Sequence, residues 1–165
     1  TPVVTDAPPR RVPPPRPLAI TGVSGSAEAP IGLAASLERE PEVGARLALL
    51  DQVVATEAAV GGADLALDAL EELLEAPLPG DFDDAQTLRL SALSHVGRLP
   101  GARSEALLAA RVGDGERPRP ERLLSVELLA GRPYAGRAEL TRVAYGDHDP
   151  VVAARARWAL EQPIR

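Results

Sequence analysis

The sequence predicts an all-α fold in which pairs of helices pack side by side behind an extended N-terminal arm. Composition is the first reason, because hydrophobic residues make up 45% of the 165-residue chain and aromatic residues only 2%. The core must therefore consist mainly of Leu, Ala and Val, whereas a sandwich or barrel would need more aromatic and β-branched side chains. The helical spacing of apolar residues from residue 31 onward, and the turn signals that divide this region into paired segments, are the other two reasons.

The N-terminal arm, which we define as residues 1–30, differs from the folded domain expected over 31–165. It holds eight of the 17 prolines, and proline fits neither a helix interior nor a central strand. The run from Pro8 to Pro17 should prefer the extended polyproline II conformation. Two interpretations stay open: the arm is a spacer, or it lies along a partner. In the second case its charged contacts are Arg10, Arg11 and Arg16.

The clearest helical pattern covers residues 63–76. Apolar side chains recur at helical spacing on one face, and acidic side chains follow steps of four, three and four on the opposite face. The apolar face comprises Ala66, Ala69, Leu70 and Leu73. The acidic face comprises Asp64, Asp68, Glu71 and Glu75, which we predict to bind a basic partner.

Four segments begin alike, and they indicate a repeat. Helices are expected over 40–50, 86–99, 119–131 and 149–160, with proline near the start of all but the second, because proline suits the first helical turn. Shorter helices are expected between them, over 31–38, 63–76, 103–111 and 136–145, separated by Gly- and Pro-containing turns such as Gly61-Gly62. The positions predicted to be buried are Leu47, Leu50, Leu70, Leu73, Ala92, Val126, Leu129, Val152 and Ala156.

The pattern acid-Pro-x-Val at the start of a helix rich in Ala, Leu and Arg resembles the second helix of a HEAT repeat, especially the short bacterial type. The match is good at Glu40–Leu50 and at Asp149–Leu160, and partial at 119–131, where Arg122 replaces the apolar residue. This resemblance covers 31–165 as four imperfect hairpins. It implies a short right-handed α-solenoid with an extended binding surface and no particular ligand, since HEAT-like proteins are mostly scaffolds and adaptors.

Few residues suggest chemistry. His148 lies between Asp147 and Asp149, a set that is either a divalent-metal site or a loop in which Asp149 caps the next helix. His95 should be hydrogen-bonded beside a buried stripe. The acidic run 81–84 lacks the glycine of a calcium loop and is typical of a helix start. The sequence has no cysteine, no His-Glu-x-x-His pair and no Ser/His/Asp or paired-carboxylate arrangement beyond periodic surface charge. We therefore predict no catalytic residue, no metal site and no cofactor.

Charge is distributed unevenly along the chain. Residues 31–100 carry four arginines against thirteen acidic residues, a net −9, whereas residues 101–165 carry eleven against nine, a net +2. An acidic middle of this size repels a phosphate backbone, so nucleic acid is not expected as a partner. We therefore predict a non-catalytic protein-binding scaffold or accessory subunit of a larger assembly, without a small-molecule substrate. The alternative is a small metal-dependent or HEAT-like enzyme that uses His148, Asp147 and Asp149.

Two further expectations concern the ends of the chain. Thr1 followed by a proline-rich segment is typical of the mature part of an exported or membrane-anchored bacterial protein, so a periplasmic location with a tether upstream of Thr1 is predicted. The helix that carries Trp158 lacks a polar closing hairpin after it. We expect this end to contact the folded-back arm, a second copy or another protein.

Overall fold

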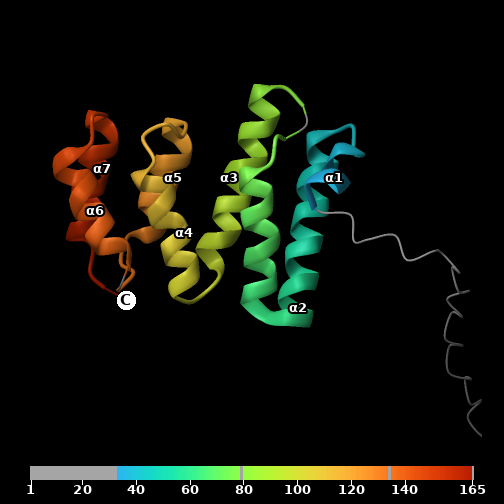
Figure 1. Cartoon of the computed structure of the whole chain (residues 1–165), viewed down its shortest axis with the longest axis horizontal. Helices are drawn as coiled ribbons and strands as arrows, with labels where there is room; N and C mark the ends of the chain where they lie inside the picture. Colours follow the sequence, from blue (N-terminus) through green and yellow to red (C-terminus); the bar gives the residue numbers. More distant parts are fainter. Residues whose placement is uncertain (1–32, 79, 134, 165) are drawn as a thin grey trace, which may run out of the picture.

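A computed structural model describes residues 33–164 except 79 and 134. Within these residues the chain forms seven helices and no strand (Figure 1). The helices are α1 (Leu33–Glu38), α2 (Val43–Glu75), α3 (Phe82–Arg98), α4 (Ala102–Gly113), α5 (Arg119–Leu129), α6 (Ala135–Gly146) and α7 (Pro150–Glu161). The prediction of an all-α fold is confirmed. None of these described helices combines the length and apolar character needed to cross a bilayer.

Helix α2 consists of two limbs, 43–61 and 63–75, that run in opposite directions (Figure 1). The reversal occurs at Gly62, whose φ of 75° and ψ of −165° are not helical. A side chain at this position would be strained, because residues other than glycine rarely adopt such a positive φ. The turn predicted at Gly61-Gly62 is therefore confirmed, but the helix before it extends well beyond the expected end at residue 50.

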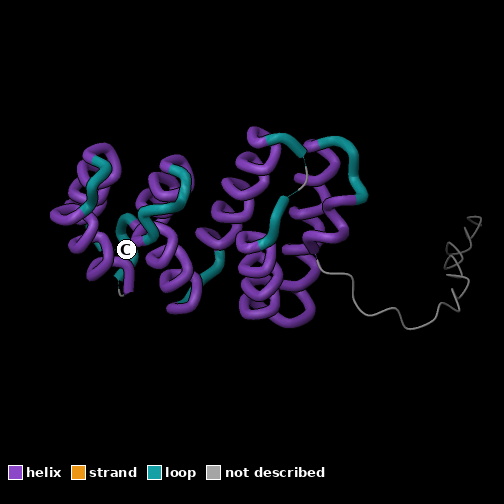
Figure 2. The backbone as a smooth tube through the Cα atoms, turned by 45° about the horizontal axis from the view of Figure 1, so that its top comes forward, coloured by secondary structure: helices purple, strands orange, loops and turns teal. Residues whose placement is uncertain are grey.

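The helices pack as hairpins in chain order. Helix α1 packs on α2, α2 on α3, α4 on α5 and α6 on α7. Neighbouring hairpins then join through α3 with α5, α5 with α7 and α4 with α6. The result is an elongated array with α1 and α2 at one end and α6 and α7 at the other (Figure 1 and Figure 2).

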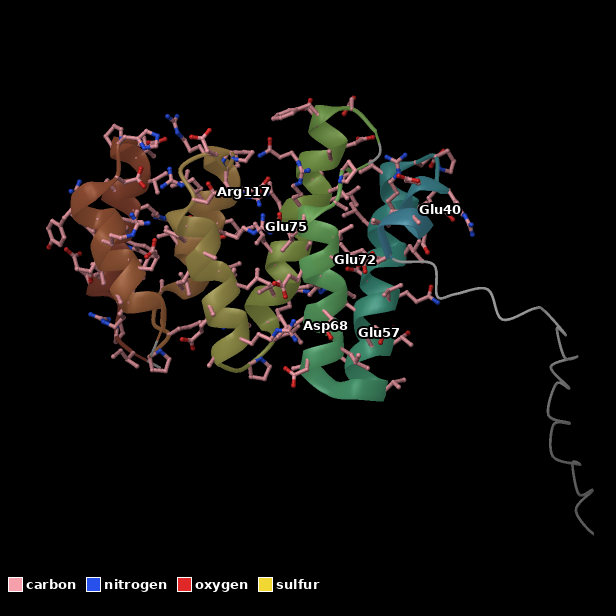
Figure 3. The ribbon with its side chains drawn as sticks, in the orientation of Figure 1. Glu40, Glu57, Asp68, Glu72, Glu75 and Arg117 are labelled. Carbon is pink, nitrogen blue, oxygen red and sulfur yellow. The ribbon has the colours of Figure 1, made fainter. Side chains whose placement is uncertain are left out.

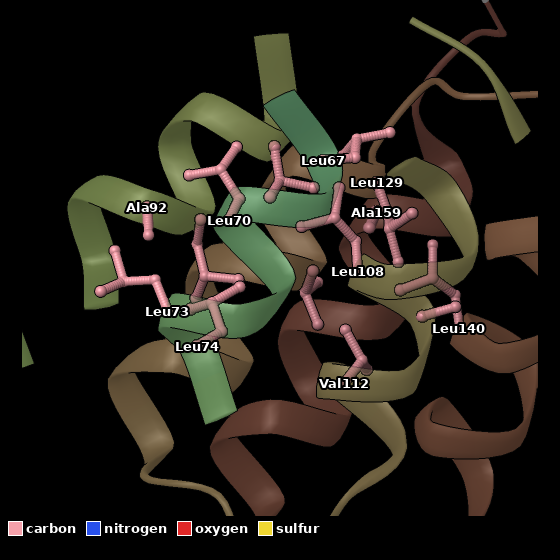
Figure 4. Close-up of a cluster of buried hydrophobic side chains, with 14 of the residues drawn as sticks. Leu67, Leu70, Leu73, Leu74, Ala92, Leu108, Val112, Leu129, Leu140 and Ala159 are labelled. Carbon is pink, nitrogen blue, oxygen red and sulfur yellow. The ribbon is translucent and has the colours of Figure 1, made fainter. Parts of the chain in front are cut away.

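Aliphatic side chains form one continuous core along the array (Figure 4). Eight of the nine positions predicted to be buried are buried. Leu47 is the exception, because the buried positions of the first limb of α2 are Arg46, Leu50 and Val54, and Leu47 lies beside that stripe, half-buried. Arg46 can occupy the stripe because its Nε donates to the carbonyl oxygen of Glu40 at 2.8 Å and its Nη1 lies 3.6 Å from Asp84 Oδ2.

Acidic side chains cap two helix starts as the sequence suggests. Asp149 Oδ1 accepts from the amides of Val151 and Val152 at 2.9 and 3.4 Å, and Pro150 begins α7. Asp81 Oδ1 accepts from the amide of Asp84 at 2.9 Å, so the run 81–84 is a helix start. The carboxylates of this first turn of α3 also lie near the positive end of the helix dipole.

Candidate functional site: an acidic face and an apolar hollow

The predicted acidic residues lie on the second limb of α2, where all four are exposed. The side chains of Asp68 and Glu71 contact Arg103 of α4. Arg103 Nη2 donates to Asp68 Oδ1 at 2.5 Å and to Glu71 Oε2 at 2.9 Å, and Nη1 donates to the carbonyl oxygen of Asp64 at 3.4 Å. The hydrogen bonds to Asp68 and then Glu71 raise the pKa of Arg103. The side chains of this acidic cluster are thus held by the next hairpin.

Glu75, at the end of the same limb, joins three parts of the chain. It accepts hydrogen bonds from Arg111 of α4 and, at 2.8 Å, from Arg117 Nη2 in the loop before α5. The hydrogen bond from Arg117 is the largest influence on the Glu75 carboxyl and lowers its pKa, although partial burial opposes the change. Arg117 Nε also donates to Asp114 Oδ2 at 3.1 Å. Glu75 is therefore the anchor of a network that ties α2 to the following hairpin.

The remaining acidic side chains around α2 are more available to a partner. Figure 3 shows Glu40, Glu57, Asp68, Glu72 and Glu75 on the part of the array formed by α2 and the turn before it. Glu72 is exposed and Glu57 half-exposed, and neither has an ion-pair partner among the described residues. We define the acidic face as the predicted cluster together with Glu57, Glu72 and the half-buried Glu40 of the turn before α2. The members of the acidic face are Glu40, Glu57, Asp64, Asp68, Glu71, Glu72 and Glu75.

Arginines link the other hairpins too, which sequence reasoning missed. Arg122 of α5 is buried, with its side chain 2% exposed, and pairs with Asp147 in the loop before α7. Its Nε donates to the carbonyl oxygen of Val112 at 3.1 Å. Arg119 Nε donates to Asp149 Oδ2 at 2.5 Å across the same interface. The partial match of 119–131 to a repeat therefore has a reason: the residue that departs from the apolar pattern makes a buried ion pair.

The ion pairs with Arg122 and Arg119 involve two of the three residues of the alternative metal site, Asp147 and Asp149. Asp147 pairs with Arg122, and Asp149 caps α7 and pairs with Arg119. His148 is 77% exposed, and its Nδ1 lies 3.8 Å from Asp147 Oδ1. Both carboxylates are thus engaged by arginine. Within the described part of the chain, no group of three or more His, Cys, Asp or Glu side chains is arranged to hold a metal ion.

His95 is hydrogen-bonded as predicted. Its Nε2 lies 2.7 Å from Asp51 Oδ1, and its side chain is 12% exposed. Because Asp51 belongs to the first limb of α2 and His95 to α3, this contact joins the first hairpin to the second. It is a structural contact between helices.

The carboxylate of Glu121 lies inside the array. Glu121 of α5 is 1% exposed, and its Oε2 has no hydrogen-bond partner among the described protein atoms. Burial raises the pKa of Glu121, although the charges of Arg89, Arg111 and Arg117 oppose the change. Arg111 is also buried, and its Nη1 likewise lacks a partner there. Burial lowers the pKa of Arg111.

An apolar hollow lies on the opposite part of the array, between α5 and α7. We define it by the residues that line it, which are Leu123, Glu127, Val151, Ala154, Arg155 and Trp158. Trp158 is 39% exposed and Val151 is 48% exposed. The guanidinium carbon of Arg155 lies 4.1 Å from the centre of the indole, within the range of a cation–π contact. The spacing of 155 and 158 along a helix could have indicated this shared face.

Arg155 also orients the polar edge of the hollow. Its Nε donates to Glu127 Oε1 at 3.0 Å, and its Nη2 donates to the same oxygen. Glu127 Oε2 is left without a described donor, and the Glu127 side chain is 44% exposed. The hollow therefore combines an exposed indole, aliphatic walls and an accessible carboxylate oxygen.

Arg10, Arg11 and Arg16, the predicted contacts of the arm, lie outside the described residues. No protein-family model matches the chain, and neither a curated protein nor a solved structure matches it.

Proposed function

We propose that the chain is a HEAT-like helical-repeat module that acts as a non-catalytic protein-binding scaffold or accessory subunit. The order of the helices supports this proposal, because four hairpins follow one another and each contacts the next. Such a stack presents a long surface relative to its mass, and binding is the usual use of such a surface. The repeat assignment also accounts for the recurring starts of α5 and α7, where proline occupies the first helical turn.

The acidic face is the observation that carries the functional proposal. Its seven carboxylates lie on α2 and the turn before it, in the region that carries a net −9 over residues 31–100. Arg103, Arg111 and Arg117 neutralise part of this charge, but the carboxylates outnumber them and the surface remains negative. A negative surface favours a partner with a basic surface, because complementary potentials raise the association rate and fix the orientation of binding. The partner is therefore proposed to be a protein with clustered lysine or arginine side chains.

The arginines of α4 and the loop after it prepare the acidic face for binding. Asp68, Glu71 and Glu75 are already held by Arg103, Arg111 and Arg117, so they have lost side-chain freedom before a partner arrives. Glu57 and Glu72, which have no such partner among the described residues, are the carboxylates that a basic side chain can approach. The arm arginines Arg10, Arg11 and Arg16 are proposed as a second contact with the same assembly.

Affinity capture with the full chain as bait, from an extract of the cells that make the protein, tests the proposal. The bait is compared with a Glu57→Gln/Glu72→Gln variant and with a control variant, Glu116→Gln/Glu161→Gln. Glu116 and Glu161 are exposed and lie outside α2, so the control makes the same change in net charge elsewhere. We expect one protein to be retained in stoichiometric amount by wild type and control, and to be reduced about tenfold for the first variant.

Equal recovery by all three baits would exclude the acidic face as the binding surface. Recovery of no stoichiometric protein from the wild-type bait would count against the scaffold itself. Substitution of Asp68, Glu71 or Glu75 is a poorer test, because it would free the buried Arg111 and its neighbours and disturb the contact between α2 and α4.

A further inference from the structure

We infer that the apolar hollow between α5 and α7 is a docking site for a proline-rich segment, and that its occupant is residues 8–17 of the same chain. The hollow has the chemistry that such segments require. Proline rings pack on aromatic rings, and Trp158, which is 39% exposed and has the Arg155 guanidinium over its ring, supplies one at the surface. Leu123, Val151 and Ala154 supply the apolar walls.

The arm has the complementary pattern. A polyproline II helix repeats every three residues or so, which places Pro14 and Pro17 on one ridge and Pro13 and Arg16 on the next. With the first ridge against the indole, Arg16 lies on a neighbouring edge. Glu127 Oε2, which has no described donor, is then its counterpart, and a guanidinium–carboxylate pair fixes the direction of the segment.

Chain length permits docking within one molecule. Residues 18–32 connect the segment to α1, and at about 3.1 Å per residue they reach about 47 Å when extended. Neighbouring helices in such an array lie about 10 Å apart, so the hollow lies about 30 Å from α1 along the stack. The connection also contains the Gly/Ser-rich stretch 21–26, which allows it to bend.

Effective concentration favours the same chain over a second copy. A random coil of this length has a mean end-to-end distance of about 20 Å, which is comparable to the required span. Tethered sites at such distances experience effective concentrations on the order of millimolar. The arm of a second copy, at ordinary protein concentrations, competes poorly with a tethered arm at this effective concentration. Docking would hold Arg16 away from a partner until the partner displaces the arm.

Trp158 is the only tryptophan in the sequence, so its fluorescence reports directly on the hollow. The 165-residue chain is compared with Pro14→Ser/Pro17→Ser and with a control that carries Pro2→Ser/Pro30→Ser, so that both variants lose two prolines of the arm. We expect wild type and control to show emission at shorter wavelength and about twofold weaker acrylamide quenching than the first variant. A synthetic peptide of residues 8–17 should restore the wild-type signal in the first variant and leave wild type unchanged. A Glu127→Gln variant should shift emission and quenching part of the way from the wild-type values toward those of Pro14→Ser/Pro17→Ser.

Three results would overturn the inference. Identical emission and quenching for wild type and Pro14→Ser/Pro17→Ser would show that the hollow is empty. If the peptide changed the fluorescence of wild type and of Pro14→Ser/Pro17→Ser equally, the hollow would also be empty in wild type. A signal that changes over about a hundredfold range of protein concentration would assign the hollow to a second copy. The acidic face is tested separately, because Glu57→Gln/Glu72→Gln should leave this fluorescence unchanged whether or not it alters partner capture.

Discussion

Arg122→Leu should destabilise the domain strongly, because it removes one member of a buried ion pair. The Arg122 side chain is 2% exposed and that of Asp147, its partner, is 7% exposed. Leucine fills much of the same volume with apolar atoms, so the main consequence is an unpaired carboxylate at a buried position. Removing one member of a buried pair typically costs about 3–5 kcal/mol. Asp147 Oδ1 still accepts a hydrogen bond from the amide of Asp149 at 2.8 Å. We therefore expect a cost at the lower end of this range, about 3 kcal/mol.

Urea denaturation followed by far-ultraviolet circular dichroism measures this change in the free energy of unfolding. The matched control is Arg142→Leu, because Arg142 also pairs with an acid and contacts a neighbouring helix but is 61% exposed. Its loss should cost less than about 1 kcal/mol. The double variant Arg122→Leu/Asp147→Asn should recover part of the loss, since no charge is then left buried. Equal costs for Arg122→Leu and Arg142→Leu, or no recovery in the double variant, would show that the buried pair with Asp147 is not the cause.

The pH dependence gives the same prediction a second readout. Burial opposes ionisation of Asp147, but the hydrogen bonds from Arg122 and from the Asp149 amide outweigh it and lower the pKa of Asp147. A lowered pKa contributes stability that is present above the ordinary pKa of aspartate, about 4, and is lost as the pH falls through the folded-state pKa. The free energy of unfolding of wild type should therefore fall in acid, and that of Arg122→Leu should fall by less over the same pH range.

Three further predictions concern stability. Leu70→Ala removes a fully buried side chain from the core and should cost about 2–5 kcal/mol in urea denaturation. Gly62→Ala should cost about 1 kcal/mol because of its positive φ, whereas Gly44→Ala, inside a helix and with open space around it, should stabilise by about 0.5–1 kcal/mol; equal effects would contradict the turn geometry. Glu121 has a raised pKa, so its ionisation destabilises the fold as the pH rises through that value, and Glu121→Gln should stabilise at neutral pH but not in acid; a pH-independent difference would contradict this.

Much of the fold follows from local sequence signals. The helix that ends at Glu161 begins at Pro150 because Asp149 caps it, and each of these features is readable from residue type and order. The reversal at Gly61-Gly62 is equally local. The underestimated length of the first limb of α2 was also readable, because residues 51–60 contain neither glycine nor proline and give the helix no reason to stop.

The contacts of charged side chains were harder to predict. Helical periodicity correctly placed Asp68 and Glu75 on an exposed face, but it does not say which residues of the next hairpin lie opposite. Arg103 is 35 residues from Asp68 in sequence, so their contact depends on how the hairpins pack. Likewise, periodicity alone favours Leu47 over Arg46 for the core. Arg46 is buried because the packed structure supplies oxygen acceptors for its guanidinium group.

If the acidic face binds a basic protein partner, the affinity should depend strongly on salt. The measurement is the dissociation constant of the captured partner with the purified 165-residue chain, by calorimetric titration over about a tenfold range of ionic strength. We expect the affinity to fall steeply with salt for wild type and for Glu116→Gln/Glu161→Gln. For Glu57→Gln/Glu72→Gln it should be weaker at low salt and should fall less steeply. An affinity that does not change with salt, or the same salt dependence for all three proteins, would contradict it.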